Sequence, residues 1–280
     1  MNSGKFYIIP TPIGNMSDIT IRAIDVLKKS NLIIAEDTRV TQKLLNHYRI
    51  KTKLISYHKF NEEKRVRFIL ELLSNGNVIS LVSDAGTPLL SDPGFIITKE
   101  VIEKGISMEV LPGPSSILPS ILLSGFNPQK FVFYGFLDKK DSKRKQELIE
   151  ISKIPYPVVI FESPFRILKL MEEILELMGN REIAVIKELT KIHENVFRGK
   201  INEVVPFLNK ENLKGEFVVV IGHCNEVYKK PDISIDELSK KINYYVKTGR
   251  TRKEIVGIIS DEFGLTRNEA YKVIHNKTEV

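Results

Sequence analysis

The chain has 280 residues, of which 42% are hydrophobic, so it is long enough to bury two ordinary cores. No stretch approaches the roughly 18 uninterrupted apolar residues of a membrane-spanning helix, and the N-terminal apolar run is too short for a signal peptide. The single cysteine excludes an intramolecular disulfide, and the sequence offers no cysteine and histidine cluster of zinc-binding spacing. A formal net charge of +7 suits a nucleic-acid or acidic partner without requiring one. We therefore expect a globular, cytoplasmic protein with two domains and a short appendage.

The first half of the chain alternates short apolar strands with amphipathic helices. Strands are predicted at residues 6–10, 32–35, 54–57, 78–82 and 108–111. Apolar residues between 18 and 30, and again between 66 and 73, recur at the helical period. Nearly continuous apolar strands that alternate with helices are typical of a parallel sheet covered on both faces. We expect an N-terminal α/β domain over residues 1–127.

The character of the sequence changes after the turn residues 125–128. A strand is predicted at 131–136, and the charge-dense segment that follows it, 138–145, is interpreted as a basic linker at the domain boundary. Further strands are predicted at 157–161, 183–186, 194–197 and 217–221, with helices at 164–178 and 201–208. This pattern indicates a second α/β domain over residues 128–228.

Residues 233–280 are predicted to form a helical tail that follows a linker at 228–232. Two short helices, 252–262 and 267–275, flank Gly264 and have helix-turn-helix length and a basic surface. Two interpretations stay open from the sequence. The tail is either a cap that packs on the enzyme or on a second subunit, or an element that contacts RNA.

Three polar loops that contain glycine follow predicted strands, at residues 10–15, 83–88 and 112–116. Because the carboxyl ends of parallel strands meet at one edge of a sheet, three such loops define a crevice for a ligand. Asp84 can accept hydrogen bonds from a ribose or an ammonium group, and Ser115 and Ser116 can donate from a helix start. Neither the dinucleotide-binding glycine fingerprint nor a phosphate-binding P-loop is present. The loops predict a site for another nucleoside-bearing ligand.

Further polar clusters end other strands, at residues 35–39, 56–58, 161–166 and 187–191. The Glu36-Asp37-Thr38 run fits a helix N-cap, whereas Arg39 is unfavourable in the first turn of a helix and is a candidate to meet a phosphate. Lys187 and Glu188 fit a general base, an electrostatic clamp or a solvated strand end. The sequence does not separate these roles.

Taken together, these motifs resemble the tetrapyrrole (corrin/porphyrin) methylase superfamily. Within it, they are similar to the bacterial 16S ribosomal RNA cytidine 2′-O-ribose methyltransferases. The resemblance covers nearly all of residues 5–222, and its most specific run is 82–88. It rests on residues 11–15, 35–39, 56–58, 81–88, 91–94, 111–115, 135–137, 162–164 with Arg166, 187–191 and 214–216. Lys187 departs from the pattern, because arginine is more frequent there.

The resemblance implies two α/β domains with S-adenosylmethionine in the cleft between them, and usually a homodimer. It implies 2′-O-methylation of cytidine 1402 of 16S ribosomal RNA, in the decoding centre of the 30S subunit. By position, the cofactor-binding residues would be Pro12, Asp84, Gly86, Thr87, Ser115, Ser116, Phe161, Glu162, Leu189 and Thr190.

Methyl transfer from a sulfonium requires alignment of the two reacting atoms and removal of a proton from a weakly acidic hydroxyl. Candidates for the general base are Glu36, Asp37, His58, Lys187 and Glu188. Candidates for binding RNA are Arg39, His58, Lys139, Lys143, Arg144, Arg250, Arg252 and Lys253. The chemistry needs no metal, and the sequence shows no metal-ligand pattern.

Two other functions are compatible with parts of this pattern. One is methylation of a small tetrapyrrole, which the 35–39 cluster, the 82–88 run and the basic composition disfavour. The other is RNA binding without catalysis, which the intact glycine loops and Asp84 disfavour.

Overall fold

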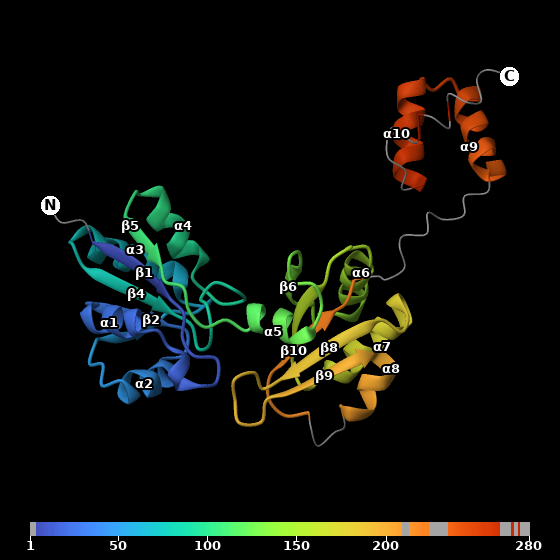
Figure 1. Ribbon diagram of the computed structural model, residues 1–280. Coiled ribbons are helices and arrows are strands. Elements are labelled where there is room, and N and C mark those ends of the chain that lie inside the picture. The colour runs from blue at the N-terminus through green and yellow to red at the C-terminus, as the bar shows by residue number, and fades with distance from the viewer. Residues whose placement is uncertain (1–3, 209–212, 224–234, 264–269, 272–273, 275–280) are drawn as a thin grey trace. The chain divides into compact units, whose positions relative to one another are not determined.

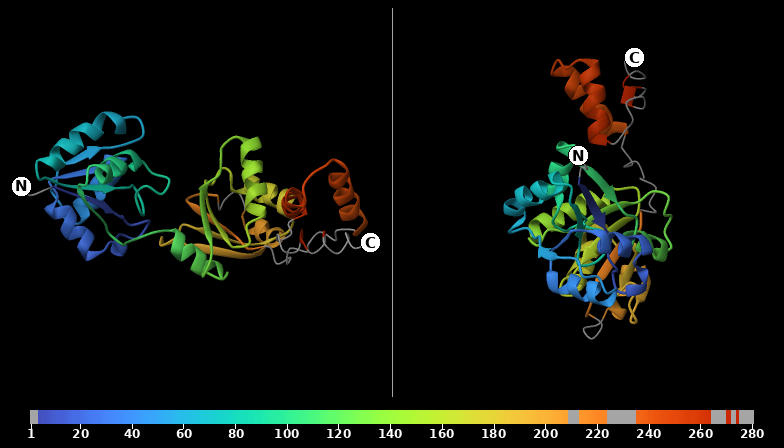
Figure 2. Two further views of the ribbon diagram at one scale, coloured as in Figure 1. Left: turned by 90° about the horizontal axis from the view of Figure 1, so that it is seen from above. Right: turned by 90° about the vertical axis from the view of Figure 1, so that its left-hand side faces the viewer.

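The computed structural model describes residues 4–208, 213–223, 235–263, 270, 271 and 274. The chain divides into two compact units, Met1–His223 and Cys224–Val280. The larger unit contains two five-stranded sheets, and the described part of the smaller unit is helical (Figures 1 and 2).

The first sheet is parallel throughout, with strand order β3-β2-β4-β1-β5 (Figure 1). Its strands are β1 (Lys5–Ile9), β2 (Leu32–Ala35), β3 (Leu54–Ser56), β4 (Val78–Val82) and β5 (Ser107–Val110). The connecting helices are α1 (Ile21–Lys29), α2 (Thr38–His47), α3 (Glu62–Ser74) and α4 (Phe95–Glu103), and the short 3-10 helix η1 (Met16–Asp18) precedes α1. The five strands predicted from the sequence are confirmed to within one residue at each end.

Helices cover both faces of this sheet, as the continuous apolar strands predict. Successive residues of a strand point to opposite faces, so each strand feeds two cores. Ile34 packs in the cluster formed with α3 and α4, and its neighbour Ile33 packs in the cluster formed with α1 and α2. Both side chains are fully buried.

The second sheet has strand order β6-β7-β10-β8-β9, and β6 with β7 is its only parallel pair of neighbouring strands. Its strands are β6 (Val132–Phe136), β7 (Val158–Glu162), β8 (Glu182–Lys187), β9 (Asn195–Lys200) and β10 (Phe217–Ile221). Helices α6 (Asp141–Ser152), α7 (Ile167–Met178) and α8 (Ile201–Val204) share the core of one face, and α5 (Ile117–Ser124) packs on the other; the 3-10 helix η2 (Val205–Phe207) follows α8. The expected α/β fold, with two sheets that are each packed against helices, is confirmed.

The interpretation of residues 138–145 as a linker is wrong. Helix α6 begins at Asp141, so most of this charge-dense segment is the first turn of a helix that packs on α7. The error has a physical cause, since the apolar residues of α6 that face the core, such as Leu148 and Ile151, all follow the charged run.

Arg144 does not lie on the surface, contrary to its prediction as an RNA contact. Its side chain is only 2% exposed, and its Nε and Nη2 donate to the two carboxylate oxygens of Glu173 in α7 at 2.6 and 2.7 Å. Nη2 also donates to Asp141 Oδ1 at 2.8 Å. Arg144 is therefore a structural residue that joins α6 to α7.

In the smaller unit, α9 (Ile235–Lys247) and α10 (Arg252–Phe263) enclose a small apolar core. The predicted helix 252–262 is confirmed as α10, whereas most of the predicted helix 267–275 and the predicted linker 228–232 lie outside the described residues. The side chains of Arg250, Arg252 and Lys253 are exposed. Among the described residues, no helix is long and apolar enough to cross a membrane.

Candidate active site

Hydrogen bonds tie together the loops that follow β1, β4 and β5. Thr11 and Gly86 exchange two backbone hydrogen bonds of 2.9 Å, and Thr11 Oγ1 donates to the Ser83 carbonyl at 3.0 Å. Thr87 Oγ1 donates to the Pro114 carbonyl at 3.2 Å. Gly86 has a φ of +76°, a left-handed conformation that glycine adopts without strain. Gly86 and Thr87 thus fix the shape of this edge of the first sheet.

In the second sheet, Glu188 joins two loops. Its Oε1 accepts hydrogen bonds from Lys191 Nζ at 2.8 Å and from the Glu216 backbone amide at 2.9 Å. Gly215 approaches so closely that a Cβ there would lie 2.3 Å from Glu188 Oε1. Burial acts to raise the pKa of Glu188, but the hydrogen bonds from Lys191 and Glu216 outweigh it and lower the pKa. Glu188 is therefore an engaged, structural carboxylate rather than a poised base.

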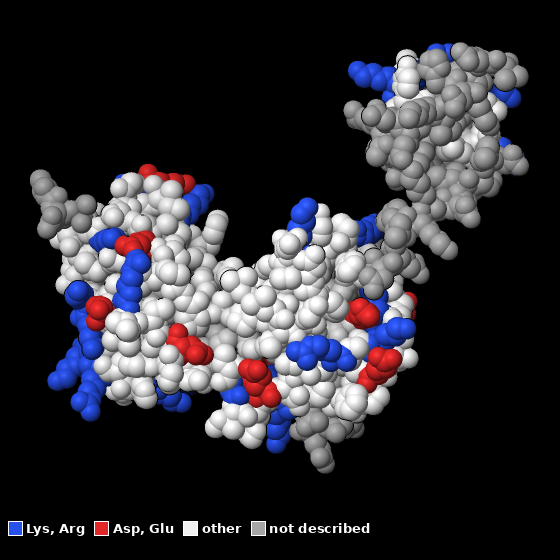
Figure 3. All heavy atoms as spheres, viewed as in Figure 1, with Lys and Arg blue, Asp and Glu red and all other residues white. Residues whose placement is uncertain are grey.

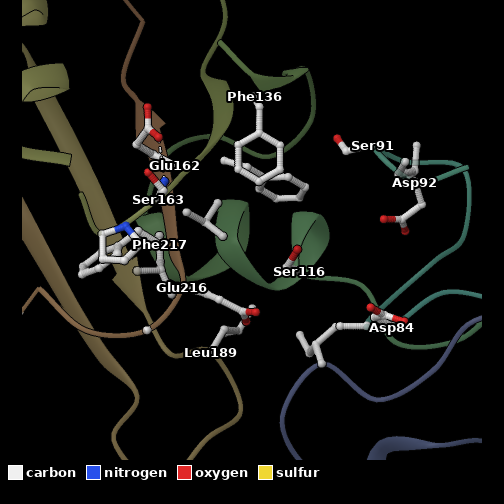
Figure 4. Close-up of a pocket in the computed structure, with 18 of the residues that line it drawn as sticks. Asp84, Ser91, Asp92, Ser116, Phe136, Glu162, Ser163, Leu189, Glu216 and Phe217 are labelled. Carbon is white, nitrogen blue, oxygen red and sulfur yellow. Dashed lines mark hydrogen bonds between the residues drawn. The ribbon is translucent and has the colours of Figure 1, made fainter. Parts of the chain in front are cut away.

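A pocket of about 470 Å³ opens where the loops of the two sheets meet. Figure 4 shows Asp84, Asp92 and Ser116 on one side of it, and Glu162 and Phe217 on the other. The full lining is Ile13, Glu36, Asp84, Ala85, Leu90, Ser91, Asp92, Ser116, Phe136, Phe161, Glu162, Ser163, Pro164, Ile186, Leu189, Gly215, Glu216, Phe217 and Val218.

The pocket brings together some of the residues predicted from the sequence and leaves others outside. The predicted residues in its lining are Glu36, Asp84, Ser116, Phe161, Glu162 and Leu189. Those outside the lining are Pro12, Gly86, Thr87, Ser115 and Thr190 among the cofactor candidates, and Asp37, Lys187 and Glu188 among the catalytic candidates. Gly86, Thr87 and Glu188 do not form the pocket wall but hold in place the loops that carry the lining residues.

Sequence reasoning missed Ser91 and Asp92, although their run was part of the family resemblance. A Ser-Asp-Pro-Gly run has the composition of an ordinary turn, so the sequence does not indicate that Ser91 and Asp92 line a pocket. In the structure, Leu89 and Ser91 both have a φ of +75°, which is unfavourable for residues other than glycine. Such backbone conformations cluster at functional sites, where the surrounding structure holds them in place.

The interior of the pocket is acidic. Burial first, and then the nearby carboxylates of Glu36 and Asp84, together raise the pKa of Asp92 to about 7. Burial also raises the pKa of Glu36 and of Asp84, and Asp84 Oδ1 accepts the Asp37 backbone amide at 3.0 Å. The described lining contains no lysine or arginine. A positively charged ligand would relieve the repulsion among these carboxylates.

Asp37 and Arg39 pair with each other at the start of α2. Asp37 is the N-cap and accepts the Arg39 backbone amide at 2.8 Å, which confirms the helix-cap interpretation. Arg39 Nη2 also donates to Asp37 Oδ2 at 2.6 Å, and the side-chain and backbone hydrogen bonds from Arg39 together lower the pKa of Asp37 to about 2. A carboxylate of such low basicity is a poor general base at neutral pH.

Two other predicted side chains are partly engaged. Glu162 is buried and pairs with Arg166 at 2.7 Å through Oε1, whereas its Oε2 is buried without a hydrogen-bond partner. His58 lies outside the pocket lining, and its Nε2 is 3.1 Å from Asn61 Nδ2 while its Nδ1 is buried without a partner.

The raised pKa of Asp92 predicts that Asp92→Asn stabilises the protein at alkaline pH. The folded-state pKa of about 7 exceeds the ordinary value of 3.8, so stability falls as pH rises through this interval. At pH 8 the neutral asparagine avoids that loss, and after allowing for partial solvent screening we expect a gain of about 1–2 kcal/mol. Urea unfolding at pH 5 and pH 8 measures it. An equal difference between variant and parent at both pH values would contradict the prediction.

The model of the tetrapyrrole (corrin/porphyrin) methylases matches residues 5–205, which include the whole first sheet, the second sheet except β10, and most of the pocket lining. The chain belongs to this family. Two of its relatives are each named Ribosomal RNA small subunit methyltransferase I. The Bacillus subtilis relative is 40% identical over 277 residues, covering 98% of this chain and 95% of its own. The Thermotoga maritima relative is 44% identical over 219 residues, covering 78% of this chain and 98% of its own.

Solved structures of other methylases share the fold. Cobalt precorrin-4 methyltransferase has a TM-score of 0.59 and 17% identity, covering 78% of this chain and 94% of its own. Uroporphyrin-III C-methyltransferase from Thermus thermophilus has a TM-score of 0.55 and 18% identity, covering 78% of this chain and 97% of its own. That second structure is complexed with S-adenyl homocysteine, the molecule that S-adenosylmethionine becomes when it loses its methyl group. The expected methylase fold is thereby confirmed.

Proposed function

We propose that this methylase uses S-adenosylmethionine to methylate the ribose 2′-hydroxyl of cytidine 1402 in 16S ribosomal RNA. The observation that carries the proposal is the acidic pocket, lined by loops of both sheets, in a chain 40% and 44% identical to relatives named for small-subunit ribosomal RNA methylation. The Thermotoga maritima relative aligns over 219 residues, close to the length of the larger unit, which supports placing the chemistry in that unit.

The pocket residues fit S-adenosylmethionine. A volume of about 470 Å³ is within the range of small-ligand sites. The ligand carries a sulfonium and an ammonium, and Glu36, Asp84 and Asp92 would stabilise that positive charge. Phe136 and Phe161 supply aromatic surface for an adenine ring or the sulfonium, and the unpartnered Oε2 of Glu162 can accept a hydrogen bond. When bound, the cofactor supplies an electrophilic methyl group.

The predicted site residues outside the pocket lining also have a role in the proposed function. The loops that bind the cofactor would be held in shape by Pro12, Gly86, Thr87, Ser115 and Thr190. Lys187 would contribute to catalysis from outside the pocket lining. The protein's task is then largely to align the ribose oxygen with the methyl carbon in a site of fixed geometry.

The tetrapyrrole alternative has weaker support. The tetrapyrrole methyltransferases among the solved structures are only 16–18% identical to this chain, so their likeness concerns the fold. The named ribosomal RNA relatives are more than twice as similar in sequence. Intact pocket carboxylates also favour an enzyme over a binding protein without catalysis.

The proposed RNA-binding surface includes exposed cations near the pocket. Lys139 and Lys143 are exposed, and they follow Phe136, which lines the pocket, by three and seven residues. On the face drawn in Figure 3, lysine and arginine gather at the outer edge over α1 and α2, while the hollow of the larger unit is mostly uncharged. Arg39, His58, Arg250, Arg252 and Lys253 complete the proposed set, from which buried Arg144 is removed.

Reversing the charges of Lys139 and Lys143 together should weaken RNA binding and its salt dependence. Each lost phosphate contact lowers the slope of log affinity against log salt by about 0.7–0.9, so we expect the double variant to lose about 1.5 in slope. Titration of labelled ribosomal RNA at several salt concentrations measures it. Lys153→Glu is the matched control, because Lys153 is exposed at the opposite end of α6. An equal loss of slope in both proteins would mean that Lys139 and Lys143 are not part of the RNA-binding surface.

We also propose a homodimer that works in the cytoplasm. The exposed side chains of Leu118 and Leu122, four residues apart on α5, form an apolar stripe of the kind that a subunit interface covers. Sedimentation equilibrium of the full chain measures the oligomeric state.

The substrate class is tested by offering labelled S-adenosylmethionine with unmodified 30S subunits, free 16S ribosomal RNA or a tetrapyrrole precursor. We expect label to enter RNA and not the tetrapyrrole. Label in the tetrapyrrole alone would reject the RNA assignment and support the alternative.

A further inference from the structure

Asp92 is a titratable pocket residue that the sequence did not suggest as a catalytic candidate. It lies in the loop between β4 and α4, next to Ser91, whose φ of +75° holds the loop in an unfavourable conformation. Its side chain lines the pocket, and Figure 4 shows it directed toward the space shared with Asp84 and Ser116. Burial and charge repulsion act on Asp92, and no hydrogen bond contributes to its pKa shift.

The structure removes most of the earlier candidates for the proton acceptor. Asp37 is paired with Arg39, and Glu188 is held by Lys191 and the Glu216 amide. Lys187 and His58 lie outside the pocket lining. Glu162 is paired with Arg166 and Glu216 with Lys191, so the carboxylates of Glu36, Asp84 and Asp92 remain among those that line the pocket.

These three carboxylates differ in their partners. Asp84 accepts a hydrogen bond from the Asp37 amide, which stabilises its charged form. The charge of His58 opposes the rise in the pKa of Glu36. Asp92 has no such opposing interaction, and its pKa of about 7 leaves it substantially ionised yet basic at neutral pH. A general base works best when its pKa lies near the operating pH. The other acidic groups that line the pocket are Glu162 and Glu216.

We propose that Asp92 is the general base that takes the proton from the nucleophilic hydroxyl of the substrate. This inference rests on the proposed function. A carboxylate oxygen of Asp92 accepts the proton of the ribose 2′-hydroxyl while a lone pair of that hydroxyl oxygen forms a bond to the methyl carbon. The carbon–sulfur bond breaks, its electron pair stays on sulfur, and the products are the 2′-methoxy ribose and the neutral thioether. Asp92 then releases its proton to water.

The test compares Asp92→Asn and Asp92→Glu with Glu36→Gln and Asp84→Asn. Single-turnover methyl transfer to unmodified 30S subunits is measured from pH 5.5 to 9 at saturating cofactor. A general base contributes about 10²- to 10⁴-fold, so we expect Asp92→Asn to lose at least 100-fold in rate and Asp92→Glu to recover part of it. The parent rate should rise about tenfold per pH unit and level off once Asp92 is ionised, below pH 7 because the positive charge of the bound cofactor lowers the pKa of Asp92, and Asp92→Asn should lack this break.

Two further measurements separate proton transfer from cofactor binding. Calorimetric titration with S-adenosylhomocysteine gives the cofactor affinity of each variant, so that the transfer rates are compared at concentrations that saturate each protein. Carbon-13 spectra of aspartate-labelled protein without cofactor should show one carboxyl that titrates between pH 6 and 8 and is missing from Asp92→Asn.

Several outcomes would overturn the proposal. These are a rate within threefold of the parent for Asp92→Asn, a pH break that persists in that variant, or a larger loss in Glu36→Gln with Asp92→Asn active. If the parent methylates RNA while Asp92→Asn is equally active, only this inference fails. If the parent transfers no methyl group to RNA, the proposed function fails, and the role of Asp92 falls with it.

Discussion

Replacing Arg144 with methionine is expected to lower the free energy of unfolding by about 3–5 kcal/mol. Arg144 is 2% exposed, and its guanidinium donates to both carboxylate oxygens of Glu173, which is itself 4% exposed. Methionine fills much of the same volume but leaves the Glu173 carboxylate buried without a partner. Denaturant unfolding of the variant and the parent at pH 7 measures the difference.

A second substitution separates the loss of the pair from the loss of packing. The double variant Arg144→Met with Glu173→Leu removes both charges, and we expect it to recover most of the stability, because apolar replacements of buried ion pairs are often neutral. Lys145→Met is the matched control, since Lys145 pairs with Glu176 at 2.8 Å on the surface, where solvent screens the pair, and should change the stability far less. A loss under 1 kcal/mol for Arg144→Met would mean that this ion pair does not hold α6 on α7.

Gly14→Val is expected to weaken cofactor binding by about 10- to 100-fold, or about 1.4–2.7 kcal/mol. A Cβ at Gly14 would lie 2.5 Å from Lys191 Cγ, 2.8 Å from Thr190 Oγ1 and 3.1 Å from the Leu189 carbonyl oxygen. Real side chains do not pack this closely, so the loop after β1 must move away from the loop after β8. Ile13 and Leu189 line the pocket on either side of this contact, and its wall must shift with them.

Calorimetric titration with S-adenosylhomocysteine measures this effect, and thermal unfolding checks that the variant is folded. Gly257→Ala is the control, because a Cβ there meets no atom within 4 Å and should leave the affinity unchanged. Unaltered affinity in a folded Gly14→Val protein would show that the cofactor does not depend on this contact.

The first sheet is well predicted from the sequence because its signals are local. Strands such as 78–82 are short apolar runs bounded by turn residues, and the helix periods between them are clear. The helix cap at Asp37 is also a local signal, in which a carboxylate precedes the first helical turn. Such features depend on neighbours a few residues away.

The site is less predictable because it depends on contacts between distant segments. Glu188 is engaged by the Glu216 amide, 28 residues further on, and Arg144 is buried by Glu173, 29 residues further on. Asp92 acquires its raised pKa from burial and from Glu36 and Asp84, which come from other loops. A sequence shows which residues are able to titrate, but their environment is set by the tertiary fold.

The proposed methylation is at one atom of the RNA, and mapping the methylated position tests it most directly. Unmodified 30S subunits are incubated with the full chain and S-adenosylmethionine, and the 16S ribosomal RNA is then cleaved with alkali, which spares the bond next to a 2′-O-methyl ribose. We expect one new protected position, at cytidine 1402, and none when the cofactor is omitted. Methylation of a base, protection at another nucleotide, or no protection while the protein binds cofactor would contradict it.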